Sequence, residues 1–229
     1  MRRLDQVMTA RQLRYLDLGG ASPVEGYLTI HLSPVEAYGK ILTPESTMAV
    51  RQDPATKQIR LERRGLQGPA AVLHYDVTAG LPLRDEFLLG LNMSHFLEHF
   101  PLESGLRLLE ECRRVLSPGG ILRVSCPDLR RYAAAYLSSN LDFYEQVGAP
   151  LYCNYNSLVT LGEKFISKAY DDANGHLWFY DSDTLVQRLH SMGFRQVTDC
   201  AVHDSSLPGI CDIEPKYRAV ESFYVEARR

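Results

Sequence analysis

The alternation of apolar and polar positions divides the chain into short apolar runs separated by polar turns. Short apolar runs that are rich in β-branched and aromatic side chains and that end at polar residues or turns predict buried strands. Such runs occupy residues 13–18, 27–32, 71–75, 87–93, 121–125, 194–202 and 222–227. A strand-rich domain follows from this pattern.

A weaker alternation lies between the second and third of these runs. Residues 47–52 and 58–63 alternate in character on either side of Asp53-Pro54-Ala55-Thr56. Two alternating runs around a polar, proline-containing turn favour a hairpin. We therefore expect a hairpin insertion at 44–66.

Helical spacing appears in the second half of the chain. Leu106, Leu109 and Cys112 share one face of a helix predicted from Leu102 to Leu116, which Ser117-Pro118-Gly119-Gly120 terminates.

Two further helices are predicted beyond it. Asp181 or Ser182 is expected to cap a helix that ends near Met192. Leu129 to Leu137 is a plausible helix, and the remainder of the segment 129–175 is expected to be a lid or substrate loop.

Strands that alternate with helices or loops and end in polar residues predict a doubly wound α/β fold. The expected architecture is one domain, residues 1–229, with a seven-stranded, mostly parallel Rossmann-like sheet and an antiparallel C-terminal edge pair. Only eight residues, 19–26, separate the first two strands, fewer than a normal parallel crossover requires. The usual first helix is therefore expected to be displaced to residues 4–13.

The amino-acid composition indicates which kinds of binding partner are to be expected. The chain has 229 residues, 45% of them hydrophobic and 23% charged, with a net charge of -3. This balance gives no electrostatic reason to expect nucleic acid or an anionic membrane surface. No stretch approaches the roughly 18 apolar residues of a membrane span. Five scattered cysteines without CxxC spacing predict reduced thiols in a cytoplasmic protein.

The most specific sequence feature runs from Asp76 to Asp128. It reads D-V-T-A-G-L-P-L-R-D-E from Asp76, M-S-H-F-L-E-H-F from Met93, and R-R-V-L-S-P-G-G-I-L-R-V-S-C-P-D from Arg113. This block resembles the class I, Rossmann-like S-adenosylmethionine-dependent methyltransferase family, in particular its branch of small bacterial methyltransferases. The resemblance implies S-adenosylmethionine as the cofactor.

The resemblance also implies a cofactor site. A cofactor made of an adenosine and a methionyl sulfonium needs a carboxylate near the adenine amine and a glycine turn near the methionyl part. Asp76 and Gly19-Gly20 suit these two tasks. The cofactor-binding residues implied are Asp17, Gly19, Gly20, His31, Asp76, Val77 and Ser94.

Two positions depart from the family pattern. The first glycine motif, Asp17-Leu18-Gly19-Gly20, lacks the usual G-x-G, and His31 stands where an acid normally binds the ribose hydroxyls. A histidine loses the charge-assisted carboxylate contact. Weak cofactor affinity is one consequence to test.

The candidate catalytic residues are His95, Glu98 and His99, which follow the fourth expected parallel strand. Methyl transfer is an in-line displacement, so a base is needed only if the acceptor must lose a proton. His95 and His99 are four residues apart and share a helical face, where either could act as a base or as an acceptor ligand. The alternative is a polar helix cap that packs the loop.

Further candidates lie on the lid side. His176 and Tyr180 are secondary site candidates, and core packing explains them as well. The tyrosines between residues 132 and 170 suit an acceptor pocket or ordinary core contacts. No metal is expected, because no third ligand has a spacing that would join His95 and His99.

Two functions of different classes remain open. The first is a methyltransferase acting on a small-molecule hydroxyl or amine acceptor, a sugar being one option. The second is a non-catalytic relative that keeps the fold for binding or scaffolding. A nicotinamide-dependent oxidoreductase is disfavoured, since no G-x-G-x-x-G opens a helix. The oligomeric state is open, a homodimer being one option.

Overall fold

A computed structural model describes residues 4–19, 26–31, 48–52, 59–62, 71–74, 77–148, 158–169, 176–214 and 216–229. Gly20 and Asp76, both predicted to bind cofactor, lie outside the described residues. For the strands between residues 48 and 74, and for His31, only the backbone is described.

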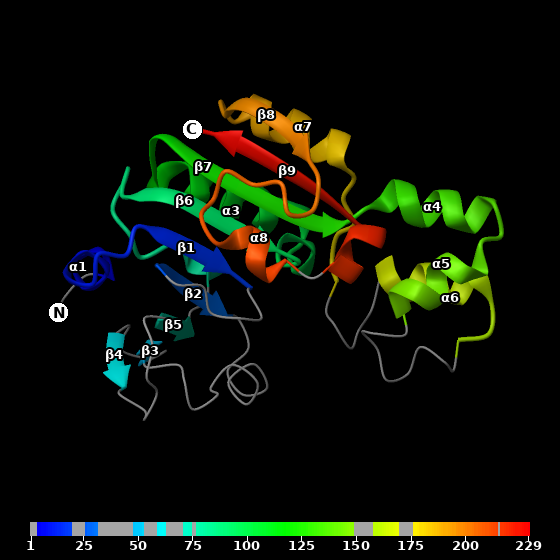
Figure 1. Cartoon of the computed structure of the whole chain (residues 1–229), viewed down its shortest axis with the longest axis horizontal. Coiled ribbons are helices and arrows are strands. Elements are labelled where there is room, and N and C mark those ends of the chain that lie inside the picture. Colours follow the sequence, from blue (N-terminus) through cyan, green and yellow to red (C-terminus); the bar gives the residue numbers. More distant parts are fainter. Residues whose placement is uncertain are drawn as a thin grey trace.

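The described residues form one sheet of nine strands in the order β4-β3-β5-β2-β1-β6-β7-β9-β8 (Figure 1). Neighbouring pairs from β3 through β5, β2, β1 and β6 to β7 are parallel. The strands are β1 (Tyr15–Leu18), β2 (Tyr27–His31), β3 (Met48–Gln52), β4 (Ile59–Glu62), β5 (Ala71–His74), β6 (Leu88–Ser94), β7 (Leu116–Pro127), β8 (Arg195–Cys200) and β9 (Ser222–Arg228).

This topology confirms the predicted fold class and corrects the strand count. β9 pairs antiparallel with both β7 and β8, as expected for the C-terminal edge. The count is nine rather than seven because β3 and β4 extend the opposite edge. They lie in the interval where a hairpin was expected, and they pair antiparallel.

The connection between β1 and β2 is unusually short, yet the two strands pair parallel. A helix precedes β1 instead: α1 (Leu4–Ala10) buries Leu4 and Met8. The expected displacement of the first helix to the N-terminal side therefore matches the described structure.

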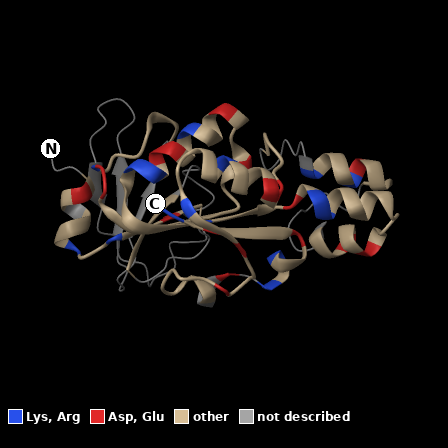
Figure 2. Cartoon of the chain, turned by 90° about the horizontal axis from the view of Figure 1, so that it is seen from above, with Lys and Arg blue, Asp and Glu red and all other residues tan. Residues whose placement is uncertain are grey.

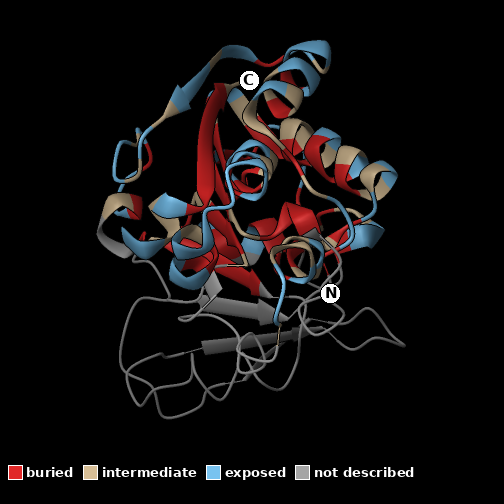
Figure 3. Cartoon of the chain, turned by 90° about the vertical axis from the view of Figure 1, so that its right-hand side faces the viewer, coloured by how far each residue is buried: buried red, intermediate tan, exposed pale blue. Residues whose placement is uncertain are grey.

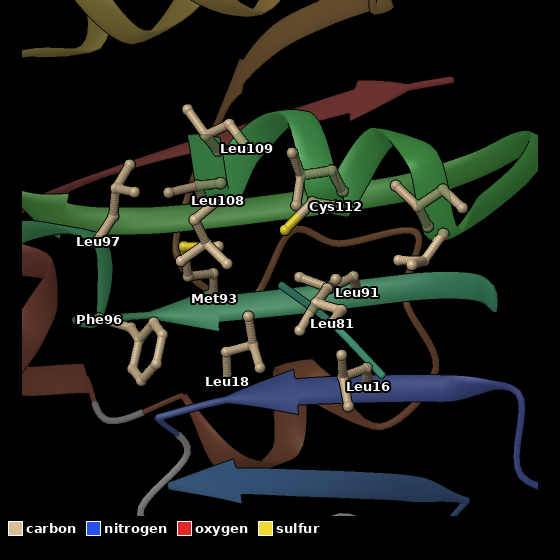
Figure 4. Close-up of a cluster of buried hydrophobic side chains, with 14 of the residues drawn as sticks. Leu16, Leu18, Leu81, Leu91, Met93, Phe96, Leu97, Leu108, Leu109 and Cys112 are labelled. Atoms are coloured by element: carbon tan, nitrogen blue, oxygen red, sulfur yellow. The ribbon is translucent and has the colours of Figure 1, made fainter. Parts of the chain in front are cut away.

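One face of the sheet packs against α3 (Leu102–Val115) and α7 (Ser182–Ser191). Alternate residues of the strands point toward these helices because side chains in a strand alternate between faces. Figure 4 shows Leu108, Leu109 and Cys112 of α3 above Leu91 and Met93 of β6. Figure 3 shows buried strands in the middle of the sheet beside helices whose outer surfaces are exposed, whereas the edge strand β8 is largely exposed.

The ends of both helices follow from their sequences. α7 begins where the side chain of Asp181 accepts a hydrogen bond from the Thr184 amide at 2.7 Å, which confirms the predicted cap. α3 ends at Val115, and residues 116–120 begin β7 rather than forming a separate turn. Gly119 has φ +77°, a conformation that glycine adopts without a Cβ penalty.

The opposite face of the sheet is covered by residues 201–214, which include the short α8 (Ile210–Ile213) (Figure 1). Leu207 and Ile210 pack against Tyr27 of β2. Gly90 of β6 permits this approach, because a Cβ there would lie 2.3 Å from Leu207 Cδ2. Among the described residues, this face of β2 and β6 is thus packed by a segment that is irregular apart from α8.

Three helices extend beyond the carboxyl end of β7: α4 (Leu129–Leu137), α5 (Leu141–Gly148) and α6 (Leu161–Ala169) (Figure 2). The α4 prediction is confirmed, whereas α5 and α6 correct the expectation of a loop. They enclose a small core of their own around Tyr132 and Tyr144. Those two tyrosines are therefore core residues of this helical cluster.

No helix among the described residues combines the length and the apolar composition needed to cross a bilayer.

Candidate active site

Asp17 lies inside the sheet rather than at its open end. It is fully buried on β1, and Asn92 of β6 donates a hydrogen bond to its Oδ1 at 2.8 Å. Thr29, Asn92 and Arg123 occupy matching positions on the neighbouring strands, so Asp17 belongs to a polar row beneath residues 201–214. Its described contacts are structural.

Burial raises the pKa of Asp17 from its ordinary 3.8 to about 7, and the Asn92 hydrogen bond opposes this only in part. A folded-state pKa above the unfolded value contributes stability that is present at low pH and is lost as the pH rises toward 7. The variant Asp17→Asn keeps an oxygen that accepts from Asn92 but carries no charge. We expect its free energy of unfolding to exceed that of wild type by an amount that grows as the pH rises. The gain grows by about 2–3 kcal/mol between pH 5 and pH 8.

Urea unfolding of both proteins across this pH range measures the difference, and the contributions of the histidines cancel because both proteins share them. Asp142→Asn on the exposed surface of α5 is the control and changes nothing. A gain that is the same at pH 5 and pH 8 would contradict the raised pKa.

Gly19 directly follows β1 and makes close contact with the turn that follows β6. Its φ is +78°, and a Cβ there would lie 2.6 Å from Cδ2 of Phe96. Its amide donates to the carbonyl of Ile30 at 2.9 Å. The glycine is therefore required by packing, and it brings the end of β1 against the turn after β6.

The other predicted cofactor-binding residues lie in different environments. Val77 is buried in a 3₁₀ turn, η1 (Val77–Ala79), where its side chain joins the main core. Ser94 ends β6, and its hydroxyl accepts a hydrogen bond from Ser125 at 3.2 Å. His31 is the last residue of β2, in register with His74 of β5.

The turn after β6 holds the three predicted catalytic residues. His95 has φ +48°, and Leu97, Glu98 and His99 form a 3₁₀ turn, η2. Nδ1 of His95 lies 2.9 Å from Nη1 of Arg218, and Nε2 lies 2.8 Å from the Ser222 hydroxyl. Because a guanidinium only donates hydrogen bonds, Nδ1 is the acceptor and Nε2 carries the proton. Burial, followed by the charge of Arg218, lowers the pKa of His95.

His95 therefore acts as a positioning residue, since both of its ring nitrogens are engaged by protein groups. It holds η2 against β9 through Ser222 and against η4 (Lys216–Val220) through Arg218.

Glu98 is a buried carboxylate at the centre of the turn. Its side chain is 1% exposed, its Oε1 lies 3.3 Å from Nδ1 of His95, and neither oxygen has a well-aligned hydrogen bond from the described residues. Burial acts to raise its pKa, but the histidines at 95, 176 and 99 outweigh burial and hold the pKa below its usual range. A charged, incompletely bonded carboxylate in a protein interior is costly unless a further cation or donor binds it.

His176, a secondary candidate in the sequence, joins this turn. The amides of Leu177 and Trp178 donate to the main-chain carbonyl of Glu98, at 2.8 and 3.2 Å. Those bonds bring the His176 ring beside His99, with ring centroids 4.9 Å apart, and place Nε2 4.0 Å from Glu98 Oε1. Burial lowers the pKa of His176. Tyr180, the other secondary candidate, is buried in the main core.

A second polar cluster fixes this site to the helical cluster. Glu221 is buried before β9, and it accepts hydrogen bonds from Tyr132 of α4, Lys168 of α6 and Arg218. Arg218 also contacts His95, so Glu221 and Glu98 are connected through one guanidinium and one imidazole. Sequence reasoning missed Lys168, Arg218 and Glu221, because nothing in their local patterns links them to the turn after β6.

Comparison with known proteins gives one family match and many similar folds. The family model described as a methyltransferase domain matches residues 36–124. No curated protein matches the chain. A solved S-adenosylmethionine-dependent methyltransferase from Archaeoglobus fulgidus is 16% identical, with a TM-score of 0.50 over 98% of this chain and 94% of its own.

Residues 36–124 thus match a methyltransferase domain, and the chain has the fold of S-adenosylmethionine-dependent methyltransferases. The class I methyltransferase predicted from the sequence is thereby confirmed, with S-adenosylmethionine as the cofactor of that class, whereas the bacterial branch stays a prediction. A second solved structure, of the Haloferax volcanii Trm112 methyltransferase activator with the putative methyltransferase, shares the fold at 11% identity and a TM-score of 0.51. That alignment covers 98% of this chain and 92% of the other.

The family match covers only part of the expected site. Residues 36–124 include the turn with His95, Glu98 and His99, but they begin after Asp17, Gly19 and His31. The positions that depart from the family pattern therefore lie outside the matched segment. The close approach of Gly19 to Phe96 nevertheless brings the residue after β1 against the turn that carries His95, Glu98 and His99.

Proposed function

We propose that the protein transfers a methyl group from S-adenosylmethionine to a hydroxyl or amine of a small-molecule acceptor, a sugar being one option. The observation that carries the proposal is the contact between Gly19, at the end of β1, and the turn that holds His95, Glu98 and His99. In open α/β sheets ligands bind outside the carboxyl ends of the strands. A cofactor beside Gly19 would thus meet an acceptor beside η2.

The groups around η2 suit an acceptor that must be oriented before transfer. His99 is half-buried, and its ring makes no hydrogen bond to the described residues, so it is free to contact a ligand. Glu98 offers a carboxylate. Alignment of acceptor and sulfonium supplies most of the acceleration in such a displacement, with proton removal added where the acceptor is a hydroxyl.

The remaining parts of the proposal rest on composition and on the sequence. The net charge of -3 suits a small acceptor better than a polyanion. Cys112 and Cys126 are free and buried, in keeping with a reducing, cytoplasmic location. Asp76, Gly20 and His31 complete the proposed cofactor site, and a homodimer is one option for the assembly.

Calorimetric titration with S-adenosylmethionine and S-adenosylhomocysteine tests the proposal. We expect both to bind, and we expect Asp76→Ala to weaken binding by about 10- to 100-fold, because a charge-assisted hydrogen bond is lost. Asp142→Ala, an exposed aspartate on α5, is the matched control. Absence of binding by wild type at millimolar cofactor would overturn the proposal.

A non-catalytic relative is the second candidate, favoured by His31 at the end of β2, where an acid is expected. It predicts that wild type binds cofactor poorly and that His31→Asp improves binding. Tight binding by wild type in the same titrations would eliminate this candidate.

A further inference from the structure

Three potential metal ligands converge beneath the turn after β6. The carboxylate of Glu98 and the rings of His99 and His176 offer ligand atoms that all lie within 4.8 Å of one another. They come from two segments far apart in the sequence, which the bonds from the Leu177 and Trp178 amides to Glu98 hold together. Two imidazoles and one carboxylate form a common ligand set for divalent transition metals.

The hydrogen bonds around these residues leave their ligand atoms available. His176 Nδ1 lies 2.8 Å from the main-chain carbonyl of Lys168, which only accepts, so Nδ1 carries a proton and Nε2 faces Glu98. Metal-binding histidines commonly donate their second nitrogen to a carbonyl in this way. Glu98 is 1% exposed, its Oε1 lies 3.3 Å from Nδ1 of His95, and neither of its oxygens has a well-aligned hydrogen bond from the described residues.

We propose that Glu98, His99 and His176 bind one divalent first-row transition metal ion. Ligand atoms about 2.1 Å from a shared ion lie about 3.0–3.5 Å apart, so binding requires the three side chains to close by about 1 Å. The nearby cations do not prevent this. Lys168 pairs with Glu221 at 3.1 Å, and Arg218 pairs with the same carboxylate at 3.0 Å.

A metal held by three protein ligands keeps positions for other ligands. An acceptor hydroxyl bound at such a position would lose its proton more easily, since a metal lowers the pKa of a bound oxygen. This role rests on the proposed function. Metal binding itself does not.

Titration of the chelator-treated chain with Co²⁺, followed by visible absorption and then by competition with Zn²⁺, tests the site. We expect one equivalent to bind to wild type, and we expect His99→Ala, His176→Ala and Glu98→Gln each to weaken binding by more than about 100-fold. His190→Ala, an exposed histidine on α7, is the matched control and binds as wild type does.

Thermal unfolding supplies the second measurement. Zn²⁺ is expected to raise the Tm of wild type and of His190→Ala, and to leave the Tm of His99→Ala unchanged. His99 is half-buried, so its variant keeps the test decisive even if Glu98→Gln does not fold.

No stoichiometric binding by wild type, or equal binding by wild type and His99→Ala, would overturn the metal site. The titration contains no S-adenosylmethionine, so failure of the proposed function leaves its result unaffected.

Discussion

Replacing Arg123 by methionine is expected to lower the free energy of unfolding by about 3–5 kcal/mol. Arg123 is fully buried on β7, where its guanidinium donates to both carboxylate oxygens of Glu214, at 2.7 and 2.9 Å, and to Glu226 at 3.2 Å. Methionine fills similar space but leaves two buried carboxylates without their cation. Urea unfolding monitored by circular dichroism measures the loss.

A control and a double variant distinguish the loss of charge pairing from the loss of packing. Arg107→Met, on the exposed side of α3, is the matched control and is expected to change stability by no more than about 0.5 kcal/mol. Adding Glu214→Gln to Arg123→Met removes one uncompensated charge and should recover part of the loss. A loss below about 1 kcal/mol for Arg123→Met alone would show that the buried network contributes little.

The second large effect is expected at Glu221. Its carboxylate joins α4, α6 and η4 through Tyr132, Lys168 and Arg218. Glu221→Gln preserves the shape but removes the charge that compensates the buried Lys168, a change that typically costs about 3–5 kcal/mol. We expect hydrogen exchange to accelerate in α4 and α6, because their attachment to the sheet depends on this residue.

Two further variants test the cause of that effect. Glu145→Gln, on the exposed side of α5, serves as the control and leaves exchange unchanged. Lys168→Met added to Glu221→Gln removes the unpaired cation and should restore part of the protection. Unchanged exchange in α4 and α6 of Glu221→Gln would mean that the helical cluster is held mainly by its apolar contacts.

The chain's hydrophobic pattern was sufficient for most of the sheet. The predicted bounds of β1, β2, β5, β6, β8 and β9 differ from the observed bounds by no more than about two residues at either end. The capped helix α7 begins where Asp181 predicted it. These elements are specified locally, by alternation along a strand and by a side chain that binds the first free amides of a helix.

The segment after α4 was not predictable in the same way. α5 and α6 have eight and nine residues, lengths at which an isolated helix is marginal in water. Their stability comes from packing around Tyr132 and Tyr144, which belong to the same helical cluster. β3 and β4 raised the strand count for a related reason: the sequence predicted a hairpin there, but the pairing of β3 with β5, which joins that hairpin to the sheet, depends on tertiary structure.

For the candidate site, the sequence by itself determined the turn that carries His95, Glu98 and His99, because polar residues directly follow a buried strand. Only the tertiary structure decided which groups these residues meet. It engages both nitrogens of His95 and brings His176 to Glu98. Hydrophobic periodicity reports which side of an element faces the core, whereas contacts between distant segments depend on how those elements are packed together.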